Sequence, residues 1–407
     1  MNQVIQASRD VALSLLKPSP AELEHGLELH SDLLVCDGYG FAPTSAIDGD
    51  AVSKAILEGA SENEIHWLIE NMFMTRHVTV ESERQEFVQA WKAAGVDCIF
   101  QNAGQEGPSI KTLLPRLAHF IYCTDMAPDL VTKATTPEAI VQARQQGKCC
   151  LYLTANGVPL LEERTSVQEE LTFIEVFFQL GIRMMHLTYN RRNQLGDGCA
   201  ESSNAGLSDF GRAAIAEMNR VGVIVDVAHS GWQTSLEAVQ CSEVPVIASH
   251  TSCSALADHH RCKPDEVIKA IADSGGCVGI CCIPAFLGGT GDINAFLDHI
   301  DYIARKFGMD YVSIGTDVAY ESVNAVAERN KITSRPPRRQ RLSNYWPVDD
   351  ALWDPNWNRP HQLLSLAWTN WPLFTVGLVK RGYSDKNIEK IVGRNILRVA
   401  RAVIRTI

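Results

Sequence analysis

Short runs of apolar, often β-branched residues alternate along the chain with longer amphipathic segments. The runs are apolar on both faces, as strands of a buried parallel sheet are, and the segments between them are long enough for connecting helices. Eight runs fit this description, at residues 33–38, 97–102, 149–154, 183–188, 222–227, 245–250, 277–282 and 311–316. The alternation predicts the α/β class, and eight parallel strands predict a closed (β/α)8 TIM barrel.

Capping residues mark where the connecting helices begin and end. Ser166 is followed three residues later by Glu169, the pattern of a capping box at a helix N-terminus. Ser208 begins another helical segment, and Gly222 ends it. A last helix is predicted to start at Ser384 and to cover the outside of the barrel.

Two regions depart from this alternation. Residues 1–30 predict one or two helices outside the barrel, and residues 318–372 form a long insertion after the eighth strand. Long segments at this position are often lids or oligomer contacts, although tryptophans at this density can also serve packing. We therefore interpret 1–407 as a single barrel domain with a helical extension and an insertion that acts as a lid or interface. The insertion holds five of the eight tryptophans: Trp346, Trp353, Trp357, Trp368 and Trp371.

Composition and charge narrow the function classes. With 45% hydrophobic and 21% charged residues in 407, the chain can bury a large core. The net charge of -11 disfavours nucleic acid and anionic membranes as partners, so the basic stretch at 334–341 is interpreted as a solvated or salt-bridged face. We find no signal peptide and no membrane-spanning run, and the twelve cysteines lie mostly in apolar runs as reduced thiols would. We expect a cytoplasmic protein.

Polar side chains stand directly after several predicted strands, where the active site of such a barrel lies. His229 and His250 follow successive strands, and neighbouring strands are about 4.8 Å apart, so two imidazoles can converge on one cation. The alternative is a pair of polar histidines whose hydrogen bonds are satisfied at the strand ends. The strand-end residues are Asp37, Tyr39, Asn102, Asn156, Tyr189, His229, His250 and Asp317.

Several motifs resemble the membrane (renal) dipeptidase family of zinc hydrolases. They are DVAHSG, PVIASHTSCSAL, DHHRCKPDEVIKAIADSGGCVGI and YVSIGTD, and the resemblance runs from about residue 31 to 403 with 318–368 poorly matched. It implies a (β/α)8 barrel that carries two metal ions bridged by a glutamate and cleaves dipeptides with a free carboxyl terminus.

Four residues match functional positions of that family. By resemblance, His229 and His250 hold one of the metal ions. Arg261 would bind the substrate carboxylate, a task that suits a planar guanidinium, and Asp317 would act on the substrate amine and in proton transfer.

Other positions depart from the family pattern. Tyr39 and Phe41 stand where the resemblance implies the two ligands of the other metal ion. Ala155 or Asn156 takes the place of the bridging glutamate, and Tyr189 takes that of a substrate-facing histidine. Phenylalanine cannot bind a metal, and a neutral phenol is a poor ligand for zinc.

These matches and departures favour a metal-dependent hydrolase with one zinc ion per chain, rather than two, on His229 and His250. The expected substrate is a small amide or dipeptide-like molecule with a free carboxylate, and the family suggests a homodimer. The remaining roles are substrate binding by Arg261, Asn156 and His260, and catalysis by Asp317, Tyr189 and Tyr39.

Two alternatives remain at this stage. A two-metal dipeptidase would need replacement ligands such as Asp37, Cys36 or Asn156. A catalytically inactive barrel would serve as a binding or assembly protein, with the tryptophan-rich insertion as its interface.

Overall fold

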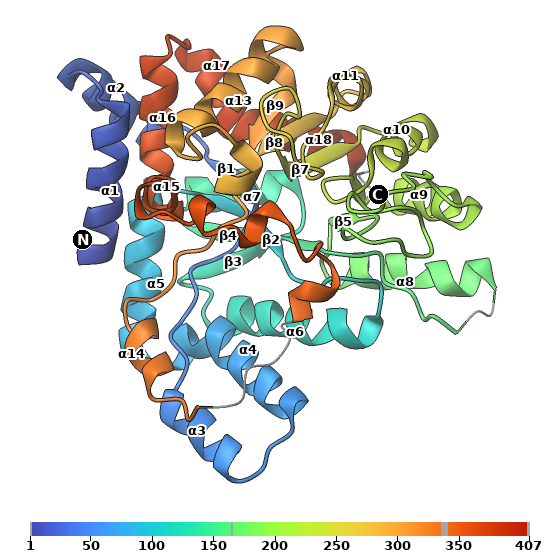
Figure 1. The fold of residues 1–407 in the computed structure, drawn as a ribbon, viewed down its shortest axis with the longest axis horizontal. Helices are drawn as coiled ribbons and strands as arrows, with labels where there is room; N and C mark the ends of the chain where they lie inside the picture. The colour runs from blue at the N-terminus through green and yellow to red at the C-terminus, as the bar shows by residue number, and fades with distance from the viewer. Residues whose placement is uncertain (1, 164–165, 335–340, 405–407) are drawn as a thin grey trace.

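The computed structural model describes residues 2–163, 166–334 and 341–404. Its centre is a sheet of parallel strands curled into a barrel, with helices around the outside (Figure 1). The hydrogen-bonded order is β1-β2-β4-β5-β6-β7-β8-β9, and the end strands β1 and β9 contact each other. All eight predicted strands are present, so the predicted (β/α)8 barrel is confirmed. They are β1 (Cys36–Gly40), β2 (Cys98–Asn102), β4 (Cys149–Ala155), β5 (Met184–His186), β6 (Ile224–Asp226), β7 (Ile247–Thr251), β8 (Cys277–Ile280) and β9 (Val312–Ile314).

One further strand, β3 (Val131–Ala134), was not predicted. It pairs in parallel with the first half of β4, outside the barrel path. The strand is short, and its two central residues, Thr132 and Lys133, are polar and only half-buried. A run of this kind lacks the apolar character that reveals the other strands.

Helices connect the strands and cover the barrel. They are α1 (Gln3–Leu16), α2 (Pro20–Asp32), α3 (Gly49–Leu57), α4 (Glu62–Thr79), α5 (Glu81–Ala94), α6 (Ile110–Met126), α7 (Pro137–Gln145), α8 (Val167–Gln179), α9 (Asp209–Val221), α10 (Trp232–Cys241), α11 (Asp265–Asp273), α12 (Pro284–Leu287), α13 (Ile293–Lys306), α14 (Ala325–Asn330), α15 (Pro360–Ser365), α16 (Trp371–Lys380), α17 (Asp385–Glu389) and α18 (Asn395–Val403). The capping box of Ser166 and Glu169 at α8 is formed as predicted, and Gly222 ends α9 with φ 94°.

The C-terminal helix that the sequence predicts from Ser384 is present, and its residues from Asp385 to Val403 are helical without a gap. The sequence did not predict the π-helical turn at Lys390–Arg394, which lies between α17 and α18 within this run. Gly393 in this turn lies against the backbone before β1, where an added Cβ would lie 2.1 Å from the Leu34 carbonyl oxygen. The wide turn therefore brings the chain into close contact with the barrel, and only glycine fits there.

The predicted N-terminal helical extension is formed by α1 and α2, which pack on α16 and α15 beside the barrel (Figure 1). The insertion contains α14, α15 and short 3₁₀ turns. Its Trp346, Trp368 and Trp371 are buried, whereas Trp353 is 39% exposed. Most of the basic stretch at 334–341 lies outside the described residues.

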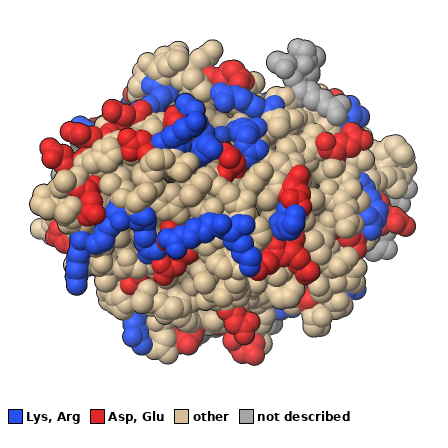
Figure 2. Space-filling model, turned by 90° about the horizontal axis from the view of Figure 1, so that it is seen from above, with Lys and Arg blue, Asp and Glu red and all other residues tan. Residues whose placement is uncertain are grey.

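Acidic and basic side chains are interspersed on the surface drawn in Figure 2. Ion pairs join acidic and basic side chains of the described residues, as between Arg381 and both Asp298 and Asp301, at 2.7 and 2.6 Å. Within the described residues, no helix combines the length and the apolar character needed to cross a membrane.

Candidate metal centre and active site

Two imidazoles meet at the carboxyl ends of adjacent strands. His229 follows β6 and His250 lies in β7, and their Nε2 atoms are 2.9 Å apart. The other ring nitrogen of each is occupied: Nδ1 of His229 contacts Asn190 Oδ1 at 2.7 Å, and Nδ1 of His250 contacts Ser249 Oγ at 2.8 Å. The predicted convergence of His229 and His250 is therefore present, with each Nε2 turned towards the other.

Both histidines are held in the uncharged form. Burial, together with the positive charge of Arg261, holds the pKa of His229 and of His250 well below its ordinary value. A neutral imidazole offers a lone pair to a metal ion.

A third imidazole, His186 at the end of β5, was missed in the sequence. Its Nε2 lies 2.7 Å from Asp226 Oδ2 in β6, and its Nδ1 lies 3.0 Å from Asn156 Oδ1. Possible ligand atoms of His186, Asp226 and His250 all lie within 4.8 Å of one another. The alternation of side chains along β5 could have revealed it. Met184 faces the barrel interior and Met185 faces the outer core, so His186 faces inward again.

Aromatic and amide groups occupy the positions where the resemblance implies the other metal ion. The Tyr39 hydroxyl donates to Asn156 Oδ1 at 2.6 Å, and the Tyr39 ring stacks on His250 with ring centres 3.8 Å apart. Phe41 packs edge-on against Tyr39. These side chains offer no charged donor, so they do not fit a second cation.

Asp37 and Cys36 do not refill that site in the described residues. Asp37 accepts hydrogen bonds from Thr316 and from Trp368, and it belongs to none of the metal-ligand clusters found there. Cys36 is a buried thiol in the barrel interior, where it packs near Cys98.

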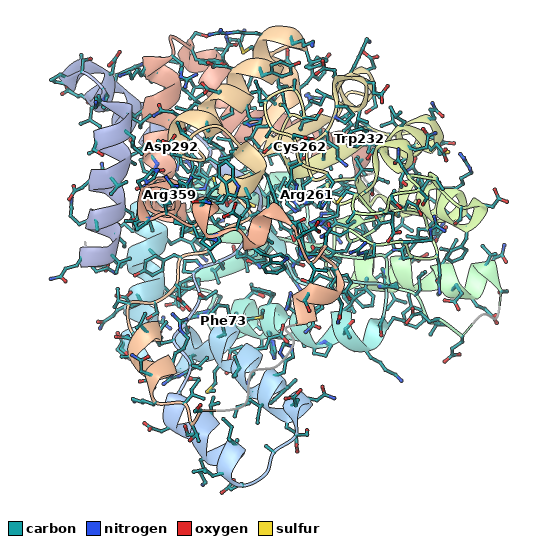
Figure 3. The ribbon with its side chains drawn as sticks, viewed as in Figure 1. Phe73, Trp232, Arg261, Cys262, Asp292 and Arg359 are labelled. Atoms are coloured by element: carbon teal, nitrogen blue, oxygen red, sulfur yellow. The ribbon has the colours of Figure 1, made fainter. Side chains whose placement is uncertain are left out.

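Arg261 lies at the centre of the molecule and is completely buried (Figure 3). Its guanidinium donates to the backbone carbonyls of Ala228 and His250, the latter at 3.0 Å. Its Nε has no acceptor among the described residues. These hydrogen bonds from Arg261 hold the backbone next to His229 and at His250 in place.

His260 points elsewhere. It is half-buried, and its Nε2 lies 3.4 Å from Asp350 of the insertion. His260 therefore lies apart from His186, His229 and His250, and it contacts the insertion at 318–372.

Asp317 follows β9 and is half-buried, with φ 58°. Burial raises the pKa of its carboxyl to about 7, although Arg261 opposes this shift. The residue borders an apolar cavity of about 300 Å³. The aromatic side chains that line this cavity belong to Phe41, Phe73, Phe87, His77 and Phe120.

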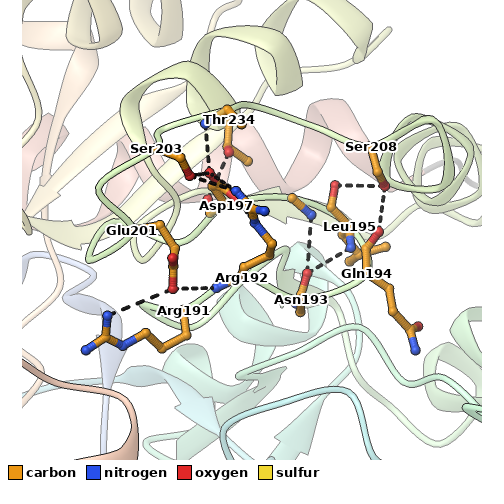
Figure 4. Close-up of polar contacts among 12 residues, drawn as sticks. Arg191, Arg192, Asn193, Gln194, Leu195, Asp197, Glu201, Ser203, Ser208 and Thr234 are labelled. Atoms are coloured by element: carbon orange, nitrogen blue, oxygen red, sulfur yellow. Dashed lines mark hydrogen bonds and ion pairs between the residues drawn. The ribbon is translucent and has the colours of Figure 1, made fainter.

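The loop after β5, whose polar contacts beyond Asn190 are drawn in Figure 4, positions Tyr189 and Asn190 beside His229. Asp197 organises this loop by accepting from Arg192 Nε at 2.5 Å and from Ser203 Oγ at 2.7 Å. The Arg192 hydrogen bond is the main cause of an Asp197 pKa of about 2. The Tyr189 ring stacks on His229 with ring centres 4.0 Å apart.

The sequence profile of the family described as Membrane dipeptidase (Peptidase family M19) matches residues 60–335, which is more than half of the chain. The protein belongs to this family. The chain is also 24% identical over 384 residues to "Dipeptidase tcpJ" of Claviceps purpurea (strain 20.1), covering 93% of this chain and 75% of that protein.

Solved structures share the fold of this chain. An amidohydrolase from Pseudomonas aeruginosa aligns with a TM-score of 0.63 and 27% identity, over 93% of this chain and 98% of that one. A metallo peptidase from Rhodobacter sphaeroides, liganded with a phosphinate mimic of the dipeptide L-Ala-D-Ala, aligns with a TM-score of 0.62 and 15% identity, over 91% of this chain and 99% of that one.

Membership of the M19 family makes this chain a hydrolase of the dipeptidase and amidohydrolase type. Its donor set fits metal binding on the side of β5, β6 and β7, because buried imidazoles with one nitrogen already fixed are typical metal ligands. On the side of β1 and β4 the residues Tyr39, Phe41 and Asn156 do not fit the second ion.

Proposed function

We propose that this M19 protein hydrolyses an amide bond in a small, dipeptide-like substrate that carries a free carboxylate. A single zinc ion on His229 and His250 serves the reaction. The observation that carries this proposal is the 2.9 Å approach of the two Nε2 atoms while both Nδ1 atoms are fixed by side-chain oxygens. A zinc ion bound there would polarise the substrate carbonyl and lower the pKa of a bound water.

The protein's own residues supply proton transfer and orientation. Asp317, whose pKa is near 7, accepts a proton from the attacking water and passes it to the leaving amine. Tyr189, half-buried over His229, donates a hydrogen bond to the oxygen that gains negative charge.

Two features support the choice of substrate. The unpaired Nε of Arg261 provides a cationic donor for a carboxylate once the side chain or its surroundings shift. The apolar cavity beside Asp317 matches an uncharged, apolar side chain on the substrate.

Elemental analysis and hydrolysis assays test the proposal together. We expect purified wild-type protein to bind a single zinc ion per chain and to cleave dipeptides with apolar residues. We expect His229→Ala and His250→Ala to lose both the metal and the activity. His30→Gln is the matched control, because His30 is buried but bonded to Thr375 and Ala94 instead.

Full activity of metal-free protein would contradict the proposal. Zinc binding without cleavage of any dipeptide in a broad panel would also contradict it, and would favour a binding protein built on the barrel.

A further inference from the structure

We propose that His186 and Asp226 complete the metal centre that His229 and His250 begin, so that β6 contributes one carboxylate ligand beside the imidazoles. This inference rests on the proposed metal-dependent function. It assigns ligands to two residues at positions that the family resemblance does not use.

The first support is the state of the two buried atoms. The side chains of His186 and Asp226 are 1% and 0% exposed, and His186 Nε2 lies 2.7 Å from Asp226 Oδ2. Within the described residues the two atoms contact each other and make no further hydrogen bond. An imidazole nitrogen and a carboxylate oxygen that face each other in the buried barrel mouth are both donors that a shared cation can use.

The remaining polar atoms of this pair are already used. Asp226 Oδ1 accepts from the backbone of Ala228 at 2.9 Å and of Ser249 at 3.1 Å, so Oδ2 is the oxygen that faces His186. Nδ1 of His186 contacts Asn156 Oδ1 at 3.0 Å, so Nε2 is the nitrogen that faces Asp226.

The spacing of the three imidazole rings is the second support. The ring centres of His186, His229 and His250 are separated by 5.2, 5.3 and 4.9 Å. A zinc–nitrogen bond of about 2.1 Å puts each ring centre about 3.2 Å from the ion, so tetrahedral ligands have ring centres about 5.2 Å apart. The ring-centre distances therefore match those of histidines around one ion. The ligand atoms of His186, Asp226 and His250 lie within 4.8 Å of one another, and His229 Nε2 joins this group through its 2.9 Å approach to His250 Nε2.

All three imidazoles make the same kind of contact with a neighbouring side chain. Each has its Nδ1 fixed by a side-chain oxygen: Asn156 for His186, Asn190 for His229 and Ser249 for His250. Such outer contacts orient metal-binding histidines and select the nitrogen that binds.

The four proposed ligands indicate which class of cation the site would bind. Three imidazoles and one carboxylate suit zinc and neighbouring transition metals, whereas Mg²⁺ and Ca²⁺ prefer oxygen ligands. Asn156, whose amide oxygen contacts Nδ1 of His186, would orient this ligand.

Metal affinity tests this assignment without reference to catalysis. Metal-free wild type, His186→Gln and Asp226→Asn are titrated with zinc against a chromophoric chelator. Outer contacts change affinity by about 10- to 100-fold, so loss of a direct ligand should weaken zinc binding by more than about 100-fold. His30→Gln, a buried histidine outside the cluster, should bind as wild type does.

Cobalt-loaded wild type provides a test that needs no variant. Its proton NMR spectrum should show three shifted imidazole N–H signals, one from each histidine of the cluster. Two signals, or wild-type zinc affinity in His186→Gln, would overturn the assignment and leave His186 and Asp226 as a structural pair.

The two proposals fail in different ways. Metal-dependent hydrolysis that is unchanged in His186→Gln overturns only the ligand assignment. Tight zinc binding through His186 without hydrolysis of any amide overturns only the proposed function.

Discussion

Tyr39 determines what the β1 side of the barrel mouth can bind. Its ring covers one face of His250 at 3.8 Å, and its hydroxyl is committed to Asn156. Burial raises the pKa of this phenol well above its ordinary value, so it stays uncharged. An aromatic ring and an amide thus fill a region that cannot stabilise a second cation.

The carboxyl of Asp317 should control the pH dependence of the reaction. Because its pKa is raised to about 7 by burial, it is protonated below that pH and becomes a base above it. We expect the rate to rise with pH through about 7 and Asp317→Asn to lose this limb, with kcat about 10²- to 10⁴-fold lower. The pH–rate profile, with metal content measured alongside, checks this.

The same shift has a consequence for stability with a defined sign. The ordinary pKa of 3.8 lies below the folded value of about 7, so the folded protein binds more protons between these values. The contribution of Asp317 to stability therefore falls as pH rises across that window, and Asp317→Asn should flatten this part of the curve. An unchanged curve and an unchanged rate profile would contradict the assigned pKa.

At the level of residues, the site residues that follow directly after a strand could be predicted from the sequence. His229, His250 and Asp317 could be located because parallel strands end on one side of the sheet. His186 lies inside its strand, so only the inward alternation within β5 reveals it. The inward turn of Arg261 could not be predicted, because it depends on the backbone carbonyls that the loops bring together.

The carboxylate of Asp350 links the insertion to the loop after β7. Asp350 Oδ1 lies 3.2 Å from His259 Nε2, and Oδ2 lies 3.4 Å from His260 Nε2. Beside this contact, Trp346 stacks on Phe286 with ring centres 5.7 Å apart. These contacts hold the segment that reaches the active site.

We expect Asp350→Ala to loosen this segment. Loss of the buried contact costs about 1–2 kcal/mol, which corresponds to about a tenfold increase in KM. Metal content and kcat should change little, and limited proteolysis should cut the insertion faster. The exposed neighbour Asp349→Ala is the control, and equal KM values in both variants would show that this contact does not position the segment.

The elements were predictable where their pattern was strong. The eight barrel strands are continuous apolar runs, whereas β3 is short and half polar. The π-helical turn in the last helix lies where Gly393 approaches Leu34, a contact between distant parts of the chain that no local pattern contains.

On the scale of the whole molecule, Asp37 closes the barrel. The strands β1 and β9 end the hydrogen-bonded path, and Asp37 in β1 accepts from Thr316 Oγ1 at 2.6 Å and Thr316 N at 2.9 Å after β9. Trp368 of the insertion donates to the same carboxyl at 3.1 Å. The side chain of Asp37 thus joins both ends of the sheet to the insertion at 318–372.

Removing this acceptor should destabilise the entire fold. Asp37→Ala leaves buried donors of Thr316 and Trp368 unpaired, and we expect it to lower the free energy of unfolding by about 3 kcal/mol. Asp37→Asn keeps one acceptor oxygen, but its NH2 group must face either Thr316 N or Trp368 Nε1, which can only donate. Chemical denaturation should therefore rank Asp37→Asn between wild type and Asp37→Ala, and equal losses in both variants would contradict this role.

The covered position of the imidazole cluster also governs how an ion reaches it. His186, His229 and His250 are each at most 3% exposed, and Tyr189 separates His229 from Tyr345 of the insertion. An ion held there can exchange with solvent only when these covering groups move, so exchange follows the rate of opening rather than the strength of the ligands. Zinc added to the folded, metal-free protein should therefore reach the cluster at the rate of this opening.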